Sequence, residues 1–560
     1  MLSVLLIWIY IFITTFFCGV CFLSLIAGKD KREASFSLLK PEDFCLCGIM
    51  LSTVFAQIFS LFYKVGLAAN IVLLLISAAS LLYIIKAKAA PAIRFDLKTA
   101  VLLIFLTLLM SYACSRGYFH YDSGLYHGQS IRWIEEYGVV KGLGLLHMRL
   151  GYNSSSFALS ALYSFSFMGG QSYHTVQGYL ALLLLIKCLR VFHIFKDKTL
   201  RISDVTRLGG FYYIFNIYDE MVAPASDYFA MITFIFCVIT ALDIYERCAA
   251  EPTHNNEEAY VFPALLSVYI PTVKLSTAPA VLLILIPVVM LLKNKKFGRL
   301  FFYAVISVII TLPLFIRNVI ISGRLFYPST ALDIFTPAWK IPASEAAMDS
   351  AYIVCFGRGY IDPAAAGYPF IQWFPHWLQT LGRSDLLIFS LCLLSVLIFP
   401  LSIVLRKGFK ILHVIELTAI ASFLFWLISA PLVRYGMGFL LLLPPLMFGD
   451  LAGLITERSD KERSFGRLIK QCFPVLLIAF LGLKCLATVK YIAGSATAPY
   501  YLKQLDYEDF ECNEVNIDGI LIYVPTEGDQ SGYHKFPSTP RIMDGLHLLG
   551  ESLKDGFVLR

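Results

Sequence analysis

One stretch near the start of the chain decides the fold class. Residues 2–27 read LSVLLIWIYIFITTFFCGVCFLSLIA, a run without a single charged side chain. A helix rises about 1.5 Å per residue, so a run of this length crosses the roughly 30 Å hydrocarbon core of a bilayer. Because the run is continuous and not alternating, it predicts a membrane helix and excludes a transmembrane β-strand.

The rest of the chain repeats this pattern. Of its 560 residues, 58% are hydrophobic, and the mean hydropathy of +0.71 leaves too little polar surface for a soluble domain. We therefore expect an all-α polytopic membrane protein with about 12 to 14 transmembrane helices. The predicted spans are 2–27, 43–63, 66–86, 98–115, 173–195, 209–223, 226–246, 260–273, 276–293, 299–321, 385–405, 410–430, 434–455 and 468–489.

Basic clusters between these runs predict the orientation. Each cluster follows an odd-numbered span, and loops rich in Lys and Arg stay in the cytoplasm. The N-terminus and the tail after residue 490 are then outside, with Lys64 a minor exception; the net charge of +7 reflects topology and not a nucleic-acid partner. The clusters are Lys29/Lys31/Arg32, Lys86/Lys88/Arg94/Lys98, Lys196/Lys198/Arg201/Arg207, Lys293/Lys295/Lys296/Arg299, Arg406/Lys407/Lys410 and Arg458/Lys461/Arg463.

Three long segments lie outside under this topology: 115–172, 322–383 and 491–560. The first two are loops of a transmembrane domain, residues 1–490. The third mixes polar residues with the β-like stretch Ile520–Val524, followed by a Pro-rich turn region. We expect residues 491–560 to form a small extracytoplasmic α/β cap.

Two pairs of neighbouring spans are unusually short. They are 209–223 with 226–246 and 260–273 with 276–293, and they turn at Val222–Asp227 and at Pro271–Ser276. Broken helices at membrane depth are tolerated where they line a cavity inside the protein. The pattern predicts a central cavity open to the outer face; ordinary tight hairpins are the alternative.

Ionisable side chains gather near the predicted outer ends of the spans. Such groups are costly beside a membrane and usually mark a functional pathway. A one-sided set is harder to explain by snorkelling to headgroups, although that alternative stays open for each arginine. The set is Asp122, His127, Asp219, Glu220, Asp227, Lys274, Arg317 and Arg434.

Asp122 is the best candidate for a general base. It begins the stretch Asp122–His127 (DSGLYH) after an early span, and a sheltered carboxylate with a raised pKa suits that role. The alternative is that Asp122 or Ser123 is a helix N-cap, because 130–137 reads as an amphipathic interfacial helix. In that helix the interface would take Ile131, Trp133 and Ile134, and water would take Arg132, Glu135 and Glu136.

Several specific sites are absent from the sequence. It contains no G-x-x-x-x-G-K-[ST] loop, no H-E-x-x-H and no Cys/His cluster at metal-ligand spacing. Most of the thirteen cysteines lie in apolar runs or at their ends. Only Cys355 and Cys512 fall in the long external segments, and a disulfide between them is a hypothesis.

Four stretches carry a resemblance to a known family: Tyr121–His127, Arg317–Pro328, Trp339–Pro342 and Phe425–Gly436. With an acidic residue in an outer loop after an early span, the chain resembles the GT-C superfamily of polytopic membrane glycosyltransferases. It is most similar to an uncharacterised bacterial branch with this layout, and the tail from Gly528 to Phe557 is part of that similarity.

The resemblance implies a reaction. Such enzymes move a sugar from a polyprenyl-phosphate-linked donor to a surface glycan, lipid or protein acceptor, at the outer face of the inner membrane of a bacterium. It implies Asp122 as the base, and Lys274, Arg317 and Arg434 as ligands of the lipid phosphate. Asp227, His127 and Tyr327 would position donor or acceptor. A single aspartate, in place of an adjacent acidic pair, leaves a divalent metal possible but assigns it no ligand.

Two other functions use similar sequence features. A transporter or flippase for lipid-linked saccharides also has broken helices and intramembrane charges, but it needs polar groups that reach both faces. A polymerase or ligase for lipid-linked saccharides would place its key groups in one late loop, where this chain has Arg358, His376 and Arg383. A scaffold without catalytic activity is the remaining reading. All of these work in the lipid bilayer.

Overall fold

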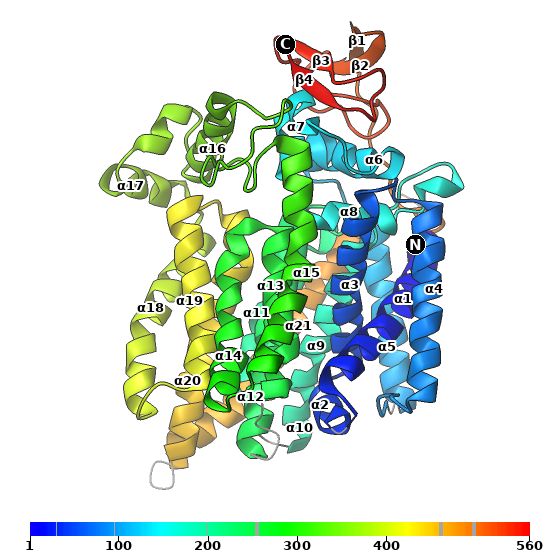
Figure 1. The fold of residues 1–560 in the computed structure, drawn as a ribbon. Helices are drawn as coiled ribbons and strands as arrows, with labels where there is room; N and C mark the ends of the chain where they lie inside the picture. The colour runs from blue at the N-terminus through cyan, green and yellow to red at the C-terminus, as the bar shows by residue number, and fades with distance from the viewer. Residues whose placement is uncertain (30, 94–95, 198, 252–256, 459–462, 496–499) are drawn as a thin grey trace.

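Twelve helices of the described residues are long and apolar enough to cross a membrane, which confirms the predicted class of a helical multi-span protein. The computed structural model describes the whole chain except residues 30, 94–95, 198, 252–256, 459–462 and 496–499 (Figure 1). Three members of the basic clusters, Arg94, Lys198 and Lys461, lie outside the described residues.

The spans run side by side in one bundle (Figure 1). The span Leu275–Lys293 is built from two consecutive helices, η8 and α14, and α9 continues through η4 to Asp197. The bounds are α1 Leu2–Ala27, α3 Pro41–Ser60, α4 Leu67–Lys86, α5 Leu97–Arg116, α9 Val176–Leu189, α12 Ser226–Ala250, η8 Leu275–Ile284, α14 Leu285–Lys293, α15 Phe297–Ser322, α18 Arg383–Leu405, α19 Ile411–Ser429, α20 Val433–Arg458 and α21 Arg463–Ser495.

The other two predicted spans are short helices, α11 Ile202–Asn216 and α13 Val261–Val273. The second agrees with the predicted 260–273. The first is displaced toward the N-terminus from 209–223, because the Asp204 carboxylate accepts the Arg201 N–H at 3.0 Å and starts the helix there. Gly209 then lets α11 approach α20, since a β-carbon there would lie 2.3 Å from the carbonyl oxygen of Leu441.

Most of the shorter helices lie at one end of the bundle, beneath the strands (Figure 1). Except for η5 they belong to the two long loops, and we call this end the cap end. Their bounds are η1 Ser123–His127, α6 Gly128–Glu136, α7 Leu143–Leu146, η2 Met148–Tyr152, α8 Ser155–Leu162, η3 Ser166–Met168, η5 Tyr218–Glu220, α16 Ala343–Gly357, η9 Pro363–Gly367 and α17 Phe370–Thr380. The remaining short helices are α2 Arg32–Leu38, η4 Arg190–His193, α10 Ile194–Asp197 and η7 Glu257–Tyr260.

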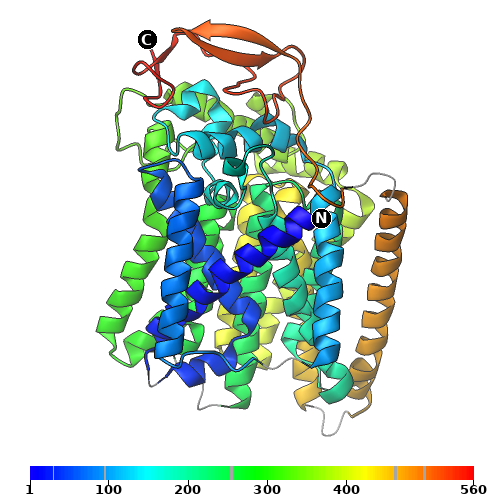
Figure 2. The ribbon, with the colours of Figure 1, turned by 90° about the vertical axis from the view of Figure 1, so that its right-hand side faces the viewer.

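Residues 500–560 form the cap, which sits on the loop helices (Figures 1 and 2). It holds two antiparallel pairs, β1 Cys512–Ile517 with β2 Ile520–Pro525, and β3 Leu546–Leu548 with β4 Phe557–Leu559. The predicted β-stretch 520–524 is confirmed as β2. The expectation of an α/β cap is wrong in one respect: residues 500–560, all described, contain no helix. Their strands are joined by tight turns and loops.

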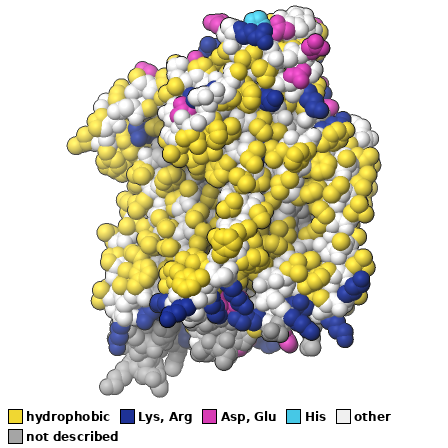
Figure 3. Space-filling view, in the orientation of Figure 1, with side chains coloured by type: hydrophobic (Ala, Val, Ile, Leu, Met, Phe, Trp, Pro, Cys, Tyr) yellow, Lys and Arg dark blue, Asp and Glu magenta, His cyan; other side chains and the backbone are white. Residues whose placement is uncertain are grey.

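The surface of the bundle carries an apolar belt, and Lys and Arg side chains rim the end opposite the cap (Figure 3). The span within α21 is the most exposed, with 11% of its most apolar window buried, and it stands at the rim of the bundle (Figure 2). An apolar exterior of this kind requires lipid as its solvent. The basic residues of the loops between spans thus gather at one end of the bundle.

Helix α6 differs from its predicted setting. Its apolar residues are buried, Ile131 and Trp133 completely, and so is Glu135, which was expected in water. Glu135 accepts hydrogen bonds from Ser172 Oγ at 2.8 Å and Tyr533 Oη at 2.5 Å. The cap covers the helix and supplies one of these donors, so α6 is an internal support and not an interfacial helix.

The proposed disulfide is absent. Cys355 lies on α16 and Cys512 begins β1 in the cap, and both are free thiols. The Cys355 thiol donates to the main-chain oxygen of Tyr352 at 3.3 Å, and the Cys512 thiol donates to that of Phe510 at 3.6 Å. Each thiol therefore bonds within its own local segment.

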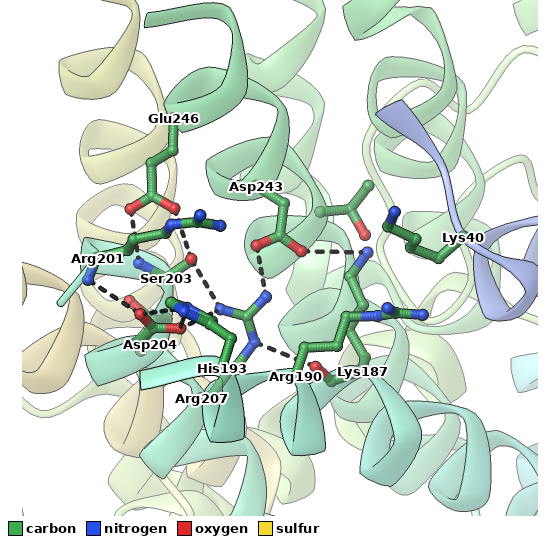
Figure 4. A network of polar contacts seen from close by, with 12 residues as sticks. Lys40, Lys187, Arg190, His193, Arg201, Ser203, Asp204, Arg207, Asp243 and Glu246 are labelled. Atoms are coloured by element: carbon green, nitrogen blue, oxygen red, sulfur yellow. Dashed lines mark hydrogen bonds and ion pairs between the residues drawn. The ribbon is translucent and has the colours of Figure 1, made fainter. Parts of the chain in front are cut away.

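A network of buried charges crosses the bundle near the basic end (Figure 4). Lys187 Nζ on α9 lies 2.8 Å from Asp43 Oδ1 on α3 and 3.4 Å from Asp243 Oδ2 on α12. Arg207 of α11 binds the same Asp243 at 2.5 Å and Asp204 at 3.0 Å. Four helices are therefore held together by a continuous chain of ion pairs.

This network corrects the expectation that membrane-depth charges lie on one side only. Of its members, only Arg207 belongs to a basic cluster of the sequence. Lys187 and Asp43 are both almost fully buried, with relative exposures of 1% and 0%. A buried charge is tolerated because its partner is buried with it, and removing one partner leaves the other uncompensated.

Replacing Lys187 by Met should destabilise the protein by about 3–5 kcal/mol, because Asp43 would be buried without its cation. The measurement is the midpoint of thermal or denaturant unfolding in detergent micelles. The double variant Lys187→Met/Asp43→Asn should recover a large part of the loss. Lys196→Met, an exposed lysine at the same end of the bundle, is the control. Equal stability of the Lys187 and Lys196 variants would contradict the role assigned to the network.

Candidate functional site

A large cavity of about 1360 Å³ lies in the bundle near the cap end. Its wall includes the whole junction Pro271–Ser276 between α13 and η8, which confirms the cavity that the short spans predicted. Sites for single drug-sized ligands usually measure roughly 300–1,000 Å³. The cavity therefore has room for more than one small ligand, or for one ligand with a long chain.

Acidic and basic side chains alternate across the polar part of the cavity. Arg434 Nη2 donates to Asp122 Oδ2 at 2.8 Å, and Arg434 Nε lies 3.3 Å from Asp227 Oδ2. Asp227 also pairs with Lys274 Nζ, and Asp122 Oδ1 lies 3.8 Å from Arg149 Nη1. The result is a chain of five charged groups, with Arg434 at its centre.

Asp122 stands where the chain enters a tight turn. It immediately precedes η1, a π-helical turn over Ser123–His127, and π-turns are frequent at functional sites. The Asp122 carboxylate makes no capping bond to the helix that follows. The N-cap alternative is therefore wrong, and the side chain is free to face the cavity.

The charge state of Asp122 differs from the sequence expectation. Burial alone would raise the pKa of its carboxyl group, but the neighbouring His127 ring and the Arg434 guanidinium hold that pKa below its ordinary value. The predicted raised pKa is wrong for this state of the protein. Asp122 is a carboxylate at neutral pH, and its basicity is limited while Arg434 binds it.

Two histidines flank this carboxylate. Burial lowers the pKa of His120 to about 4 and that of His127 to about 3, so both rings are neutral at pH 7. The His120 ring accepts a hydrogen bond from Arg434 Nη1 at 2.8 Å. His127 is completely enclosed, and its Nδ1 lies 3.3 Å from Ser123 Oγ. The two rings therefore position their neighbours without adding charge.

Lys274 is a cation of the cavity whose charge changes near neutral pH. Its ammonium group lies 3.8 Å from the centre of the Tyr435 ring, a cation–π contact. Burial, together with the positive charge of Arg434, lowers the pKa of Lys274 to about 7. The cavity therefore holds one more positive charge below neutral pH than above it.

A second cluster of polar side chains in the cavity wall is centred on Asp349 of α16. Its two carboxylate oxygens accept the hydroxyls of Tyr152 and Tyr327, each at 3.0 Å. Burial raises the pKa of this carboxyl group, opposite to the shift of Asp122. Tyr327 was predicted at the site, whereas the other two were not. The trio joins the two long loops across the cavity.

Arg317 does not line the cavity, contrary to the prediction that it binds the ligand directly. It is buried, donates to Asn153 Oδ1 at 3.0 Å, and also donates to Ser60 Oγ. Asn153 in turn donates to Asn318 Oδ1 at 2.8 Å. Both asparagines are in the wall, so Arg317 supports the wall from behind.

Two other predicted residues also lie away from the wall. Glu220 accepts the Tyr118 hydroxyl at 2.6 Å, and Asp219 contributes its main-chain oxygen to the Tyr118 N–H at 2.9 Å. These contacts fix the chain between α5 and the first loop. Among the predicted site residues, those brought together in the cavity wall are Asp122, His127, Asp227, Lys274, Tyr327 and Arg434.

The structure adds site residues that sequence reasoning missed. His120 stands two residues before Asp122 and Tyr435 follows Arg434, so proximity to a quoted motif was an available signal. Arg149, Tyr152 and Asp349 lie in long loops without a motif, and only the fold brings them together. Among the described residues, no group of three or more His, Cys, Asp or Glu is placed to hold a metal ion.

Binding of an anionic lipid to the cavity should weaken as the pH rises through about 7, because Lys274 loses its proton. We expect the affinity for farnesyl phosphate, measured by calorimetry in detergent, to fall by about tenfold between about pH 6 and about pH 9. Lys274→Arg should show no such fall, because arginine keeps its charge over this pH range. The phosphate of the ligand titrates equally in both experiments, so the variant also controls for that effect. If the affinity of both proteins changed with pH in the same way, the loss of the Lys274 charge would not be the cause.

Residues 1–441 match the model of a family described as a domain of unknown function, DUF8201. No curated protein and no solved structure matches the chain. The matched region contains all of the spans up to the middle of α20 and every predicted site residue, while the cap lies beyond it. The family match covers well over half of the chain, and the protein therefore belongs to the DUF8201 family.

Proposed function

We propose that the protein is a membrane glycosyltransferase of GT-C type. It moves a sugar from a polyprenyl-phosphate-linked donor to a glycan, lipid or protein acceptor. The observation that carries the proposal is the chain of alternating charges around Arg434, inside a cavity that is otherwise largely apolar. A phosphate needs the cations, an acceptor hydroxyl needs the carboxylate, and a polyprenyl chain needs the apolar wall.

The apolar wall comes from membrane-spanning helices. Val281 and Ile284 of η8 face the cavity together with Val308 and Phe315 of α15. Val281 and Val308 are 38% and 54% exposed, and both belong to helices long and apolar enough to span a membrane. A hydrocarbon chain that follows these side chains stays out of water along its whole length, which supports a lipid-linked donor.

The chemistry follows from the charged groups. The acceptor oxygen attacks the anomeric carbon of the donor sugar while the bond from that carbon to the phosphate oxygen breaks. Asp122 accepts the proton of the acceptor hydroxyl. The departing lipid phosphate keeps the electron pair of the broken bond, and Arg434 and Lys274 stabilise its charge. This is a direct displacement with inversion at the anomeric carbon.

The low pKa of Asp122 has a consequence in this scheme. Arg434 binds Asp122 and Asp227 at once, and this limits the basicity of Asp122. A donor phosphate competes for the same guanidinium group. When Arg434 turns to the phosphate, Asp122 loses its strongest permanent counter-charge and becomes a better base. Donor binding thereby activates the base.

The proposal places the protein in the inner membrane of a bacterium, with the cap end outside. The basic rim opposite the cap supports this orientation, since Lys and Arg favour the cytoplasmic side. The donor then reaches the cavity from the outer leaflet, and the acceptor reaches it from the aqueous side.

The two competing functions find less support. A transporter needs a polar route between the faces, but Lys187, Asp243 and the other residues of the inner network are absent from the cavity wall. A polymerase or ligase needs its late-loop groups at the ligand. Arg358 instead donates to the Ala366 carbonyl at 2.9 Å, and His376 lies 3.2 Å from the Gly359 carbonyl. Neither lines the cavity.

Asp122→Asn should lower sugar transfer by about a hundredfold or more, because the general base is lost. Transfer is measured in membrane vesicles with a radiolabelled polyprenyl-phosphate-linked sugar, and the amount of inserted protein is measured in parallel. Glu136→Gln is the matched control, since Glu136 is an exposed carboxylate on the same loop and lies outside the cavity. Full activity of the Asp122 variant would overturn the assigned base. Movement of intact lipid-linked sugar across the vesicle would instead support a transporter.

A further inference from the structure

The cap takes part in the cavity itself. Of the described residues that line the cavity, Asp529 alone comes from the cap. Its Oδ1 accepts the hydroxyl of Tyr121, the residue that directly precedes Asp122. Tyr121 is 54% exposed and Asp529 is partly exposed, so the pair lies at an open edge of the cavity. Neither side chain has a role in the reaction described above.

The segment around Asp529 is fastened to the turn that carries Asp122. The Gly124 carbonyl oxygen, in the middle of η1, accepts the N–H groups of Ser531 at 3.1 Å and Gly532 at 2.8 Å. Gln129 Nε2 donates to the carbonyl oxygens of Gly532 and Lys535, at 2.9 and 2.8 Å. These bonds use main-chain groups of the cap, so they fix its backbone directly against the catalytic turn.

Arg132 of α6 extends this attachment. Its Nη1 donates to the carbonyl oxygens of Tyr533 at 2.7 Å and His534 at 2.9 Å, and its guanidinium lies over the Phe536 ring at 4.7 Å. Gly124 also faces the cap, since a β-carbon there would lie 2.4 Å from Gln530 Oε1. The position of Asp529 is thus set by a rigid contact and not by a loose loop.

The cavity therefore has two chemically different sides. On the span side the wall is apolar and continues toward the lipid belt through η8 and α15. On the cap side the wall ends in the carboxylate of Asp529 and the phenol of Tyr121, with Arg149 also in the wall. A carboxylate and a phenol offer acceptors and a donor suited to hydroxyl groups, and they offer nothing to a hydrocarbon chain.

We propose that Asp529 and Tyr121 form an acceptor subsite, where the cap binds the hydroxyl groups of a soluble saccharide acceptor. This inference rests on the proposed glycosyltransferase function. It assigns acceptor recognition to the cap, a segment outside the region matched to the family. The donor is held by the membrane domain alone.

The test compares Asp529→Asn with Asp544→Asn in the full-length protein in lipid nanodiscs. Asp544 is an exposed carboxylate of the same cap and lies outside the cavity. In the transfer assay Asp529→Asn should raise the KM for the acceptor by about tenfold, the loss of one hydrogen bond to a charged group. The KM for the donor and the affinity for farnesyl phosphate should stay within about twofold of the wild type. Asp544→Asn should match the wild type.

A second readout does not depend on transfer. Saturation-transfer NMR with methyl glycosides of common hexoses should detect binding to the wild type and to Asp544→Asn, and lose it in Asp529→Asn. If the wild type transfers no sugar but this pattern holds, the function is wrong and the saccharide subsite stands. If no glycoside binds the wild type, or if Asp529→Asn binds as well as the control, the subsite is overturned.

A structural role of Asp529 predicts a different result. If Asp529 served only to hold the turn, its replacement would speed hydrogen–deuterium exchange over residues 121–131 and impair donor and acceptor kinetics together. Gln129→Ala removes two hydrogen bonds between α6 and the cap. It should therefore show the faster exchange and the combined kinetic loss expected of a structural defect. Asp529→Asn should leave exchange over 121–131 unchanged. Faster exchange together with a raised donor KM would reject the subsite.

Discussion

The site depends on one guanidinium group with more anionic partners than it can neutralise. Arg434, at the start of α20, faces Asp122 from the first loop and Asp227 from the start of α12. In a cavity shielded from water these attractions are strong, and each partner limits what the other can do. One arginine thus joins three segments that are far apart in the sequence.

Much of the fold could be predicted from the sequence, because lipid imposes a simple rule on every span. Uncharged runs such as 2–27 must be helices, and the short span 260–273 with its junction at Pro271–Ser276 correctly predicted a cavity. The limits are also physical. The start of α11 is set by a hydrogen bond from Asp204, and the burial of Glu135 is set by the cap, and no local pattern contains either contact.

Some residues of the candidate site could also be predicted from the sequence, whereas others could be found only from the fold. Asp122 and Arg434 lie in short motifs at span ends, where a charge is conspicuous, and sequence reasoning found both. Asp349 stands in the middle of α16 without a sequence motif, and it joins the site only because the fold places α16 at the cavity. Arg317 was predicted at the site but does not line the cavity. A charge at a span end looks like a ligand-binding group, yet here it is the buried partner of Asn153.

The attachment of residues 531–535 to the first loop also concerns the order in which the protein is made. The first loop leaves the ribosome early, after α5, whereas its main-chain partners in the cap follow the last described span, α21. Every intervening span must insert before Gly124 meets Ser531. The cavity therefore stays incomplete throughout synthesis, and a partly inserted chain would expose an open groove with no finished site. The site is therefore completed only when membrane integration of the spans is finished.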